Sequence, residues 1–220
     1  MLRPLVLIAA RALALGGRTE RRAEPGAVRM AEVRARHPKL REAILADAKT
    51  TAAYRGERFR FTSRRDALVQ CVRLAAVTDA FGATVCYRIK ARLQAIGVPV
   101  LPRLFHRAAM VLGQVAIGDP VVVAPGLYLL HGQVVIDGFT EVGPNALIAP
   151  FVTIGLRGSF EGPVLGTGVS VGSGAKVLGH VRVGDRASIG ANAVVLTDVP
   201  PRATAVGVPA RIVQADDEPI

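Results

Sequence analysis

An aliphatic residue returns at every sixth position near the end of the chain, at Val171, Val177, Val183, Ile189 and Val195. A helix repeats its buried face every 3.6 residues and a strand every second residue, so neither element alone produces a strict period of six. A small or branched residue also stands two positions before each of these aliphatics, which places two inward side chains on a short strand. The repeating unit is therefore a strand followed by a corner. Such units bury their hydrophobic face only by stacking into a parallel β-helix.

The same period continues upstream with changes of register. One series consists of Ile136, Val142, Ile148 and Ile154, and an earlier series, offset by one residue, consists of Ile117, Val123 and Leu129. The register slips again between Ile154 and Leu165, so we expect the stretch GLRGSFEGP to leave the coil as a loop. Loops on a rigid scaffold carry function more often than the scaffold does.

Half of the 220 residues are hydrophobic, which is enough for a substantial core without a metal or a disulfide. Cys71 and Cys86 lie in a helical pattern and lack metal-ligand spacing. We therefore predict two buried thiols of a reduced cytosolic protein and no metal site.

The positive charge is concentrated in one half of the chain. Residues 1–110 carry 22 Lys and Arg against 8 Asp and Glu, whereas residues 111–220 carry 6 against 9. A basic half is compatible with nucleic acid, an anionic membrane surface or a phosphate-bearing ligand. Nucleic acid is disfavoured, because the arginines are scattered through helical segments with few aromatic residues and no binding motif.

The first residues, MLRPLVLIAARALALGG, contain an apolar run that is too short to span a bilayer and is interrupted by Arg11. Three interpretations stay open: a packed or amphipathic helix, which we favour, contact with a membrane surface, and a cleaved signal peptide. The expected location of the protein is the cytoplasm.

Helical patterns precede the hexads, with predicted segments at Pro38–Ala48, Asp66–Ala95 and Pro102–Leu112. After Gly113 the density of glycine and valine rises and basic residues become rare. The predicted fold class is therefore α+β. It comprises a helical domain over residues 1–112, a hexapeptide-repeat β-helix over 113–213 and an acidic C-terminal tail over 214–220.

Three stretches of the chain resemble the serine acetyltransferase family. VGVPARIV, after Pro200 and Pro201, resembles the end of the family's β-helix, FGATVCYRIKARLQAIG resembles its last helical segments, and GLYLLHG resembles the stretch that carries its catalytic histidine. The resemblance covers roughly residues 65–213. It implies a left-handed β-helix and the direct transfer of an acetyl group from acetyl-CoA to serine or another small hydroxylated metabolite.

Acetyl transfer to a hydroxyl needs a general base, and a neutral histidine suits that task at cellular pH. His131, in LLHG, is the histidine that lies on a coil where the register is offset by one residue. We predict that His131 is the base. His37, His106 and His180 are predicted to be structural or solvated.

The chain departs from the family beside this histidine. The family's two carboxylates correspond to Ala116 and Leu130, and the second histidine of its loop corresponds at best to Gly162. The imidazole would then be oriented by a backbone carbonyl or by Asp119, Asp137 or Glu141.

The resemblance also suggests ligand-binding residues. RRDALV resembles the family's Arg-Asp-Pro-Ala stretch, which makes Asp66 the candidate partner of the serine ammonium, and Arg157 in the loop is the candidate for its carboxylate. Acetyl-CoA is expected in a groove along the coils, with its nucleotide phosphates on Arg211 and its pantetheine arm on backbone groups of Gly155, Gly174, Ala175 and Ala193.

Two alternatives remain: an acetyltransferase for a sugar or a similar metabolite, and a non-catalytic β-helix that assembles with a partner enzyme. We expect a homotrimer formed through the β-helices, which the helical domains would pair into a hexamer. The acidic tail ends in Ile220 and resembles the family's terminus that binds the cysteine-synthesising sulfhydrylase, or cysteine synthase. That enzyme is therefore a candidate partner in cysteine biosynthesis.

Overall fold

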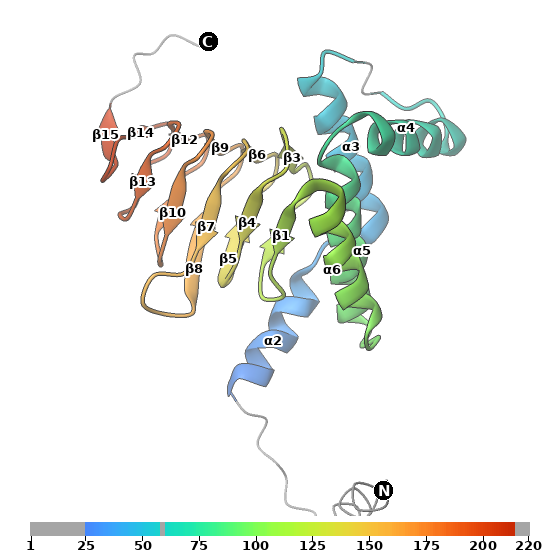
Figure 1. The fold of residues 1–220 in the computed structure, drawn as a ribbon, viewed down its shortest axis with the longest axis horizontal. Helices are drawn as coiled ribbons and strands as arrows, with labels where there is room; N and C mark the ends of the chain where they lie inside the picture. The colour runs from blue at the N-terminus through green and yellow to red at the C-terminus, as the bar shows by residue number, and fades with distance from the viewer. Residues whose placement is uncertain (1–24, 58–59, 214–220) are drawn as a thin grey trace, which may run out of the picture.

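The computed structural model describes residues 25–57 and 60–213. A group of helices packs against one end of a stack of short strands (Figure 1). The helices are α2 (Pro25–Arg36), α3 (Leu40–Tyr54), α4 (Arg64–Val77), α5 (Phe81–Ala95) and α6 (Leu101–Gly113). The last helix ends at Gly113 and the first strand begins at Val115.

The segment predicted as one helix over Asp66–Ala95 is two helices, α4 and α5, whose axes are bent by 118°. The break lies at Thr78, which adopts an extended backbone with φ −122° and ψ 146°. Its hydroxyl donates to the carbonyl of Leu74 at 2.7 Å and accepts from the amide of Phe81 at 3.3 Å. This single side chain therefore ends one helix and caps the next, an alternative to continuous helix that threonine offers.

The strands form three parallel sheets that run along the stack. Sheet A contains β1 (Val115–Ile117), β4 (Val134–Ile136), β7 (Thr153–Gly155), β10 (Lys176–Leu178) and β13 (Val194–Val195). Sheet B contains β2 (Val122–Val123), β5 (Phe139–Val142), β8 (Glu161–Leu165) and β11 (Arg182–Val183). Sheet C contains β3 (Tyr128–Leu129), β6 (Leu147–Ile148), β9 (Ser170–Val171), β12 (Ser188–Ile189), β14 (Thr204–Val206) and the antiparallel β15 (Arg211–Val213).

From β1 to β14, successive strands belong to different sheets, so the chain winds as a β-helix with one strand of sheet A in each coil. The predicted inward positions are buried, among them Val171 and Ala175 at 0% exposure. The fold prediction of a helical domain followed by a parallel β-helix is confirmed. Of the predicted loop GLRGSFEGP, residues 156–160 leave the coil between β7 and β8 (Figure 1), whereas Gly155 ends β7 and residues 161–163 begin β8.

The first coil presents its strand carbonyls to the helical domain. Neighbouring coils are joined by backbone hydrogen bonds in both directions: the amide of Gly118 donates to Ile136 of the later coil at 2.8 Å, and the amide of Asn145 donates to Pro125 of the earlier coil at 3.2 Å. The first coil has no earlier coil to pair with, and an uncovered edge of this kind is costly. Side chains of α5 donate to carbonyls on this edge. Tyr87 donates to Val121 at 3.0 Å, and Lys90 donates to Ile117 at 2.5 Å. Arg88 donates to Val123 at 2.5 Å and to Ala124 at 2.8 Å.

Asp47 of α3 completes this contact. Its carboxylate accepts from Arg88 at 2.8 and 3.0 Å and from the amides of Gly126 and Leu127, both at 2.9 Å. The side chains of Arg88 and Asp47 are 3% and 1% exposed. A buried pair is tolerated only when its remaining hydrogen-bonding groups are satisfied, and this pair meets that condition through the first coil.

Helix α2 lies across sheet B. Arg29 contacts Glu161 through two hydrogen bonds at 2.5 and 2.6 Å and stacks on the ring of Phe139 at 3.6 Å. Arg36 contacts Glu141 through a similar pair of hydrogen bonds.

Among the described residues no single helix is long and apolar enough to cross a membrane, although α4 and α5 together meet that test by length and composition.

Replacing Arg88 by methionine should lower the free energy of unfolding by about 3–5 kcal/mol, because Asp47 would be left as an unpaired buried charge. The matched control is Arg36→Met, which removes an exposed pair and should change stability by no more than about 1 kcal/mol. Urea unfolding of both variants at one protein concentration measures the difference. Equal losses would contradict the assigned role of Arg88.

Candidate active site

His131 lies at the corner between β3 and β4, where sheet C meets sheet A. Ile136 follows Leu129 by seven positions, whereas Val142 follows Ile136 by six. The corner between β3 and β4 therefore holds one residue more than the regular six-residue period allows. Gln133 makes the turn in a left-handed conformation with φ 62°. The one-residue offset in the sequence thus corresponds to a wider corner that presents His131.

Gly132 lets this corner approach the helical domain. A Cβ built on Gly132 would lie 1.7 Å from the carbonyl oxygen of Gly113, the last residue of α6, so no larger residue fits without displacing the backbone. The amide of Gln133 donates to the same carbonyl at 3.2 Å. The corner that carries His131 is therefore held against the end of α6.

The imidazole of His131 has a carboxylate partner. Its Nδ1 lies 2.5 Å from Oδ2 of Asp79, and the two side chains are 56% and 68% exposed. An ionised carboxylate only accepts hydrogen bonds, so Nδ1 carries the proton in this contact. Within the part of the chain that the structure describes, Nε2 makes no hydrogen bond, and it is the nitrogen available to a substrate.

Asp79 comes from the turn between α4 and α5, a position that the sequence analysis missed. The three carboxylates considered there are engaged elsewhere, and that expectation was wrong. Asp119 pairs with Lys90 at 3.0 Å, Asp137 accepts from the amide of Gly138 at 2.7 Å, and Glu141 pairs with Arg36. The Thr-Asp pair at 78–79 could have indicated a helix boundary at this point of the sequence, since such residues commonly mark the start of a helix.

A cavity of about 520 Å³ opens beside this pair. Its lining residues are Asp79, Val111, Leu112, Gly113, Gln114, His131, Gly132, Gln133, Pro150 and Phe151. The described lining thus combines two glutamines and apolar side chains with the Asp79–His131 pair. It offers a site in which a hydroxyl can approach Nε2 of His131.

The predicted carrier-binding residues lie on two different edges of the β-helix. Gly174, Ala175 and Ala193 occupy later corners between sheets C and A, which continue the edge that carries His131. Gly155 ends β7, at the opposite edge of sheet A. One chain therefore does not bring all four residues together.

The backbone of the His131 edge is largely engaged. The amide of Gly174 donates to Pro150 of the preceding coil at 2.9 Å, and the amides of Ala175 and Ala193 donate within their own coils, to Gly172 and Gly190, both at 3.2 Å. The side chains of Ala175 and Ala193 are buried. Of the backbone groups that we expected to bind a ligand, these three amides are engaged, so a ligand on this edge would use the second lone pairs of carbonyls.

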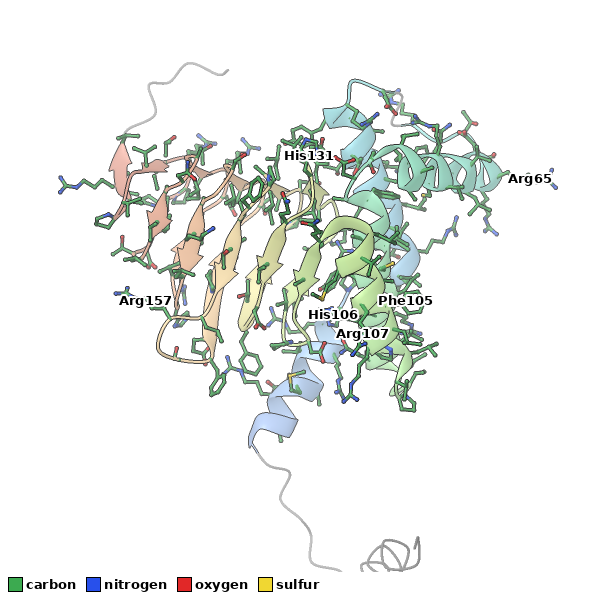
Figure 2. All side chains as sticks on the ribbon, viewed as in Figure 1. Arg65, Phe105, His106, Arg107, His131 and Arg157 are labelled. Atoms are coloured by element: carbon green, nitrogen blue, oxygen red, sulfur yellow. The ribbon has the colours of Figure 1, made fainter. Side chains whose placement is uncertain are left out.

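Asp66 is not near His131 within the chain. It stands in the first turn of α4, where its carboxylate accepts from the amide of Thr62 at 2.8 Å and its amide donates to Ser63 at 3.1 Å, a capping arrangement. Figure 2 places its neighbour Arg65 at the far end of α4 from His131.

Arg157 lies in the loop after β7, at the edge of the β-helix opposite His131 (Figure 2). Arg211 is exposed on β15.

Histidines other than His131 do not share its surroundings. Both ring nitrogens of His37 are buried, and burial together with Arg88 and Lys90 lowers its pKa to about 4. Burial also lowers the pKa of His106, while His180 is exposed. Among the described residues, no group of three potential metal ligands is placed to hold an ion.

Comparison with known proteins gives one consistent result. The family described as bacterial transferase hexapeptide (six repeats) matches residues 162–197. A serine acetyltransferase of Helicobacter pylori is 41% identical over 138 residues, which are 61% of this chain and 81% of that protein. A serine acetyltransferase of Synechococcus elongatus is 40% identical over 137 residues, 60% of this chain but 56% of that longer protein.

Solved structures agree with the sequence relatives. Soybean serine acetyltransferase complexed with serine superposes with a TM-score of 0.67 at 30% identity, covering 83% of this chain and 72% of that one. A serine acetyltransferase in complex with CoA superposes with a TM-score of 0.66 at 29% identity, covering 83% and 73%.

Proposed function

Because the chain belongs to the serine acetyltransferase family, we propose that it transfers the acetyl group of acetyl-CoA to the hydroxyl of serine. The observation that carries this proposal is the environment of His131. One nitrogen of its ring is engaged by Asp79, and the other is free at a cavity large enough for a small substrate. A histidine held in this way is suited to act as a general base.

The reaction needs no covalent enzyme intermediate. Nε2 of His131 takes the proton of the serine hydroxyl while the oxygen bonds to the carbonyl carbon of the thioester. The carbon–sulfur bond then breaks, and the departing sulfur recovers the proton from Nε2. O-acetylserine and free CoA result, and His131 returns to its neutral form.

Acetyl-CoA is the co-substrate of this proposal. Its pantetheine arm would follow the edge of the coils from His131 past Gly174 and Ala193, where carbonyls retain acceptor capacity. Arg211, exposed near the last coil, is the proposed partner of the nucleotide phosphates. We also propose a cytoplasmic location, since Cys71 and Cys86 are free thiols.

A neutral sugar hydroxyl is a second candidate acceptor. Asp79 and His131 are the titratable groups among the described cavity residues, so the chain alone offers no cation there for a serine carboxylate. Phe151 is exposed at the cavity and presents a ring face of the kind on which sugars pack. The acceptor assay below separates this possibility from serine.

His131→Ala should lower kcat with serine by about 100- to 10,000-fold, because the variant has no general base. The affinity for acetyl-CoA should change little, since that ligand lies along other coils. Thiol release from acetyl-CoA, with serine, homoserine and a set of sugars as acceptors, measures both effects. His180→Ala, at an exposed histidine of another corner, is the control. A wild-type kcat in the His131 variant would exclude its role as base.

We further propose that the enzyme is a homotrimer whose sites form between subunits. Arg157 and His131 lie on opposite edges of sheet A, so Arg157 can reach a serine carboxylate only beside the His131 of a neighbouring chain. Exposed apolar side chains support such contacts, including Val135 on sheet A and Leu104 and Val111 on α6. The exposed Leu68 and Val72 of α4 are proposed to pair trimers into hexamers.

Light scattering at micromolar concentration should therefore give at least three times the 23.1 kDa mass of the chain. Arg157→Gln should raise the KM for serine without changing the mass, whereas Arg186→Gln, at an exposed arginine of another corner, should not. Mixing His131→Ala with Arg157→Gln subunits should restore activity by forming intact sites. A monomeric mass would reject the assembly and the shared site together.

The acidic tail that ends in Ile220 lies outside the described residues. We propose that it binds a cysteine-synthesising sulfhydrylase, with its free carboxylate and aliphatic side chain occupying the amino-acid site of that enzyme.

A peptide of the last ten residues should inhibit the sulfhydrylase of the same organism competitively. The same peptide without Ile220 should lose most of its affinity, because aliphatic burial is lost and the terminal carboxylate is displaced. Inhibition kinetics with both peptides measure the effect. Absence of inhibition at millimolar concentration would reject the partner.

A further inference from the structure

The coil itself supplies no carboxylate to His131. Ala116, on β1, and Leu130, which precedes His131 and is 42% exposed, are both apolar. The carboxylate at the imidazole comes instead from Asp79, which is 52 residues earlier in the chain and belongs to the helical domain. The base and its partner therefore lie on different domains.

Two close backbone contacts hold the domains in this arrangement. A Cβ on Gly113 would lie 2.9 Å from the carbonyl oxygen of Asp79 and 3.0 Å from Cβ of Ala83. On the other side of the same residue, a Cβ on Gly132 would meet the carbonyl of Gly113. The end of α6 is thus packed between the turn that carries Asp79 and the corner that carries His131.

The turn has further support on its own side. Thr78 ends α4 and caps α5 through its hydroxyl. Along α5, Tyr87, Arg88 and Lys90 are buried and bonded to the first coil. The position of Asp79 is consequently set by backbone packing and buried polar contacts, although its side chain is exposed.

We infer that Asp79 is the positioning residue of this active site, a carboxylate that the helical domain supplies in place of coil carboxylates at 116 and 130. It accepts the Nδ1 proton of His131, which leaves the lone pair of Nε2 directed away from Asp79, and it stabilises the imidazolium that forms when Nε2 takes a proton. The inference rests on the proposed function. It adds that catalysis requires the helical domain.

Asp79→Asn tests this role. An amide keeps the size of the side chain but removes its charge, so kcat should fall at least tenfold while the KM for acetyl-CoA stays within about twofold. Glu42→Gln, which removes an exposed carboxylate of α3, is the control and should change neither quantity.

Rescue distinguishes a positional charge from a structural contact. Adding Leu130→Asp to Asp79→Asn places a new carboxylate beside the imidazole, this time on the coil. Leu130 is exposed enough for a charged side chain to be tolerated there. The double variant should recover part of the lost kcat. A wild-type kcat in Asp79→Asn would overturn the inference.

A spectroscopic measurement makes the inference independent of turnover and of variant folding. Nitrogen-15 NMR of the wild-type protein, with the His131 signals assigned from His131→Ala, should show the neutral ring protonated on Nδ1. Protonation on Nε2 would refute the inference. Failure of the proposed function would give a different result. The wild-type protein would be inactive on every acceptor, while its His131 would still be protonated on Nδ1.

Discussion

The contact on which the structure depends is the capping of the first coil by α5. The first coil of a β-helix has no earlier coil to pair with, and the carbonyls on that edge are costly unless donors cover them. Tyr87, Arg88 and Lys90 provide those donors from one helix, and Asp47 joins Arg88 to two amides of the same coil. The helical domain is therefore the end cap of the β-helix as well as a covalent neighbour.

The same cap builds the active site. Asp79 directly precedes α5 in the chain, so the bonds that anchor α5 also fix the turn that carries this carboxylate. The end of α6 fills the remaining space between Asp79 and His131, and two glycines permit that approach. Stability and the geometry of the candidate site are thus coupled physically, since loosening the cap would also move the carboxylate away from the imidazole.

The β-helix in turn separates functional groups by edge. His131 and the corners at Gly174 and Ala193 follow one edge of sheet A, while Gly155 and Arg157 follow the other. Helix α2 covers sheet B through two arginine–glutamate pairs, and none of the described helices covers the face of sheet A (Figure 1). This geometry favours a site completed by a second copy of the chain.

The sequence by itself determined the coil, the protruding loop and the placement of His131, because a six-residue period and a one-residue offset are local patterns in the chain. It did not determine the break at Thr78, the partner of His131 or the occupancy of the backbone amides along the edge. Asp79 and His131 are 52 residues apart, and nothing in either segment indicates the other. Only the packing of α5 and α6 against the first coil brings them within 2.5 Å, because that contact depends on side chains from several segments at once.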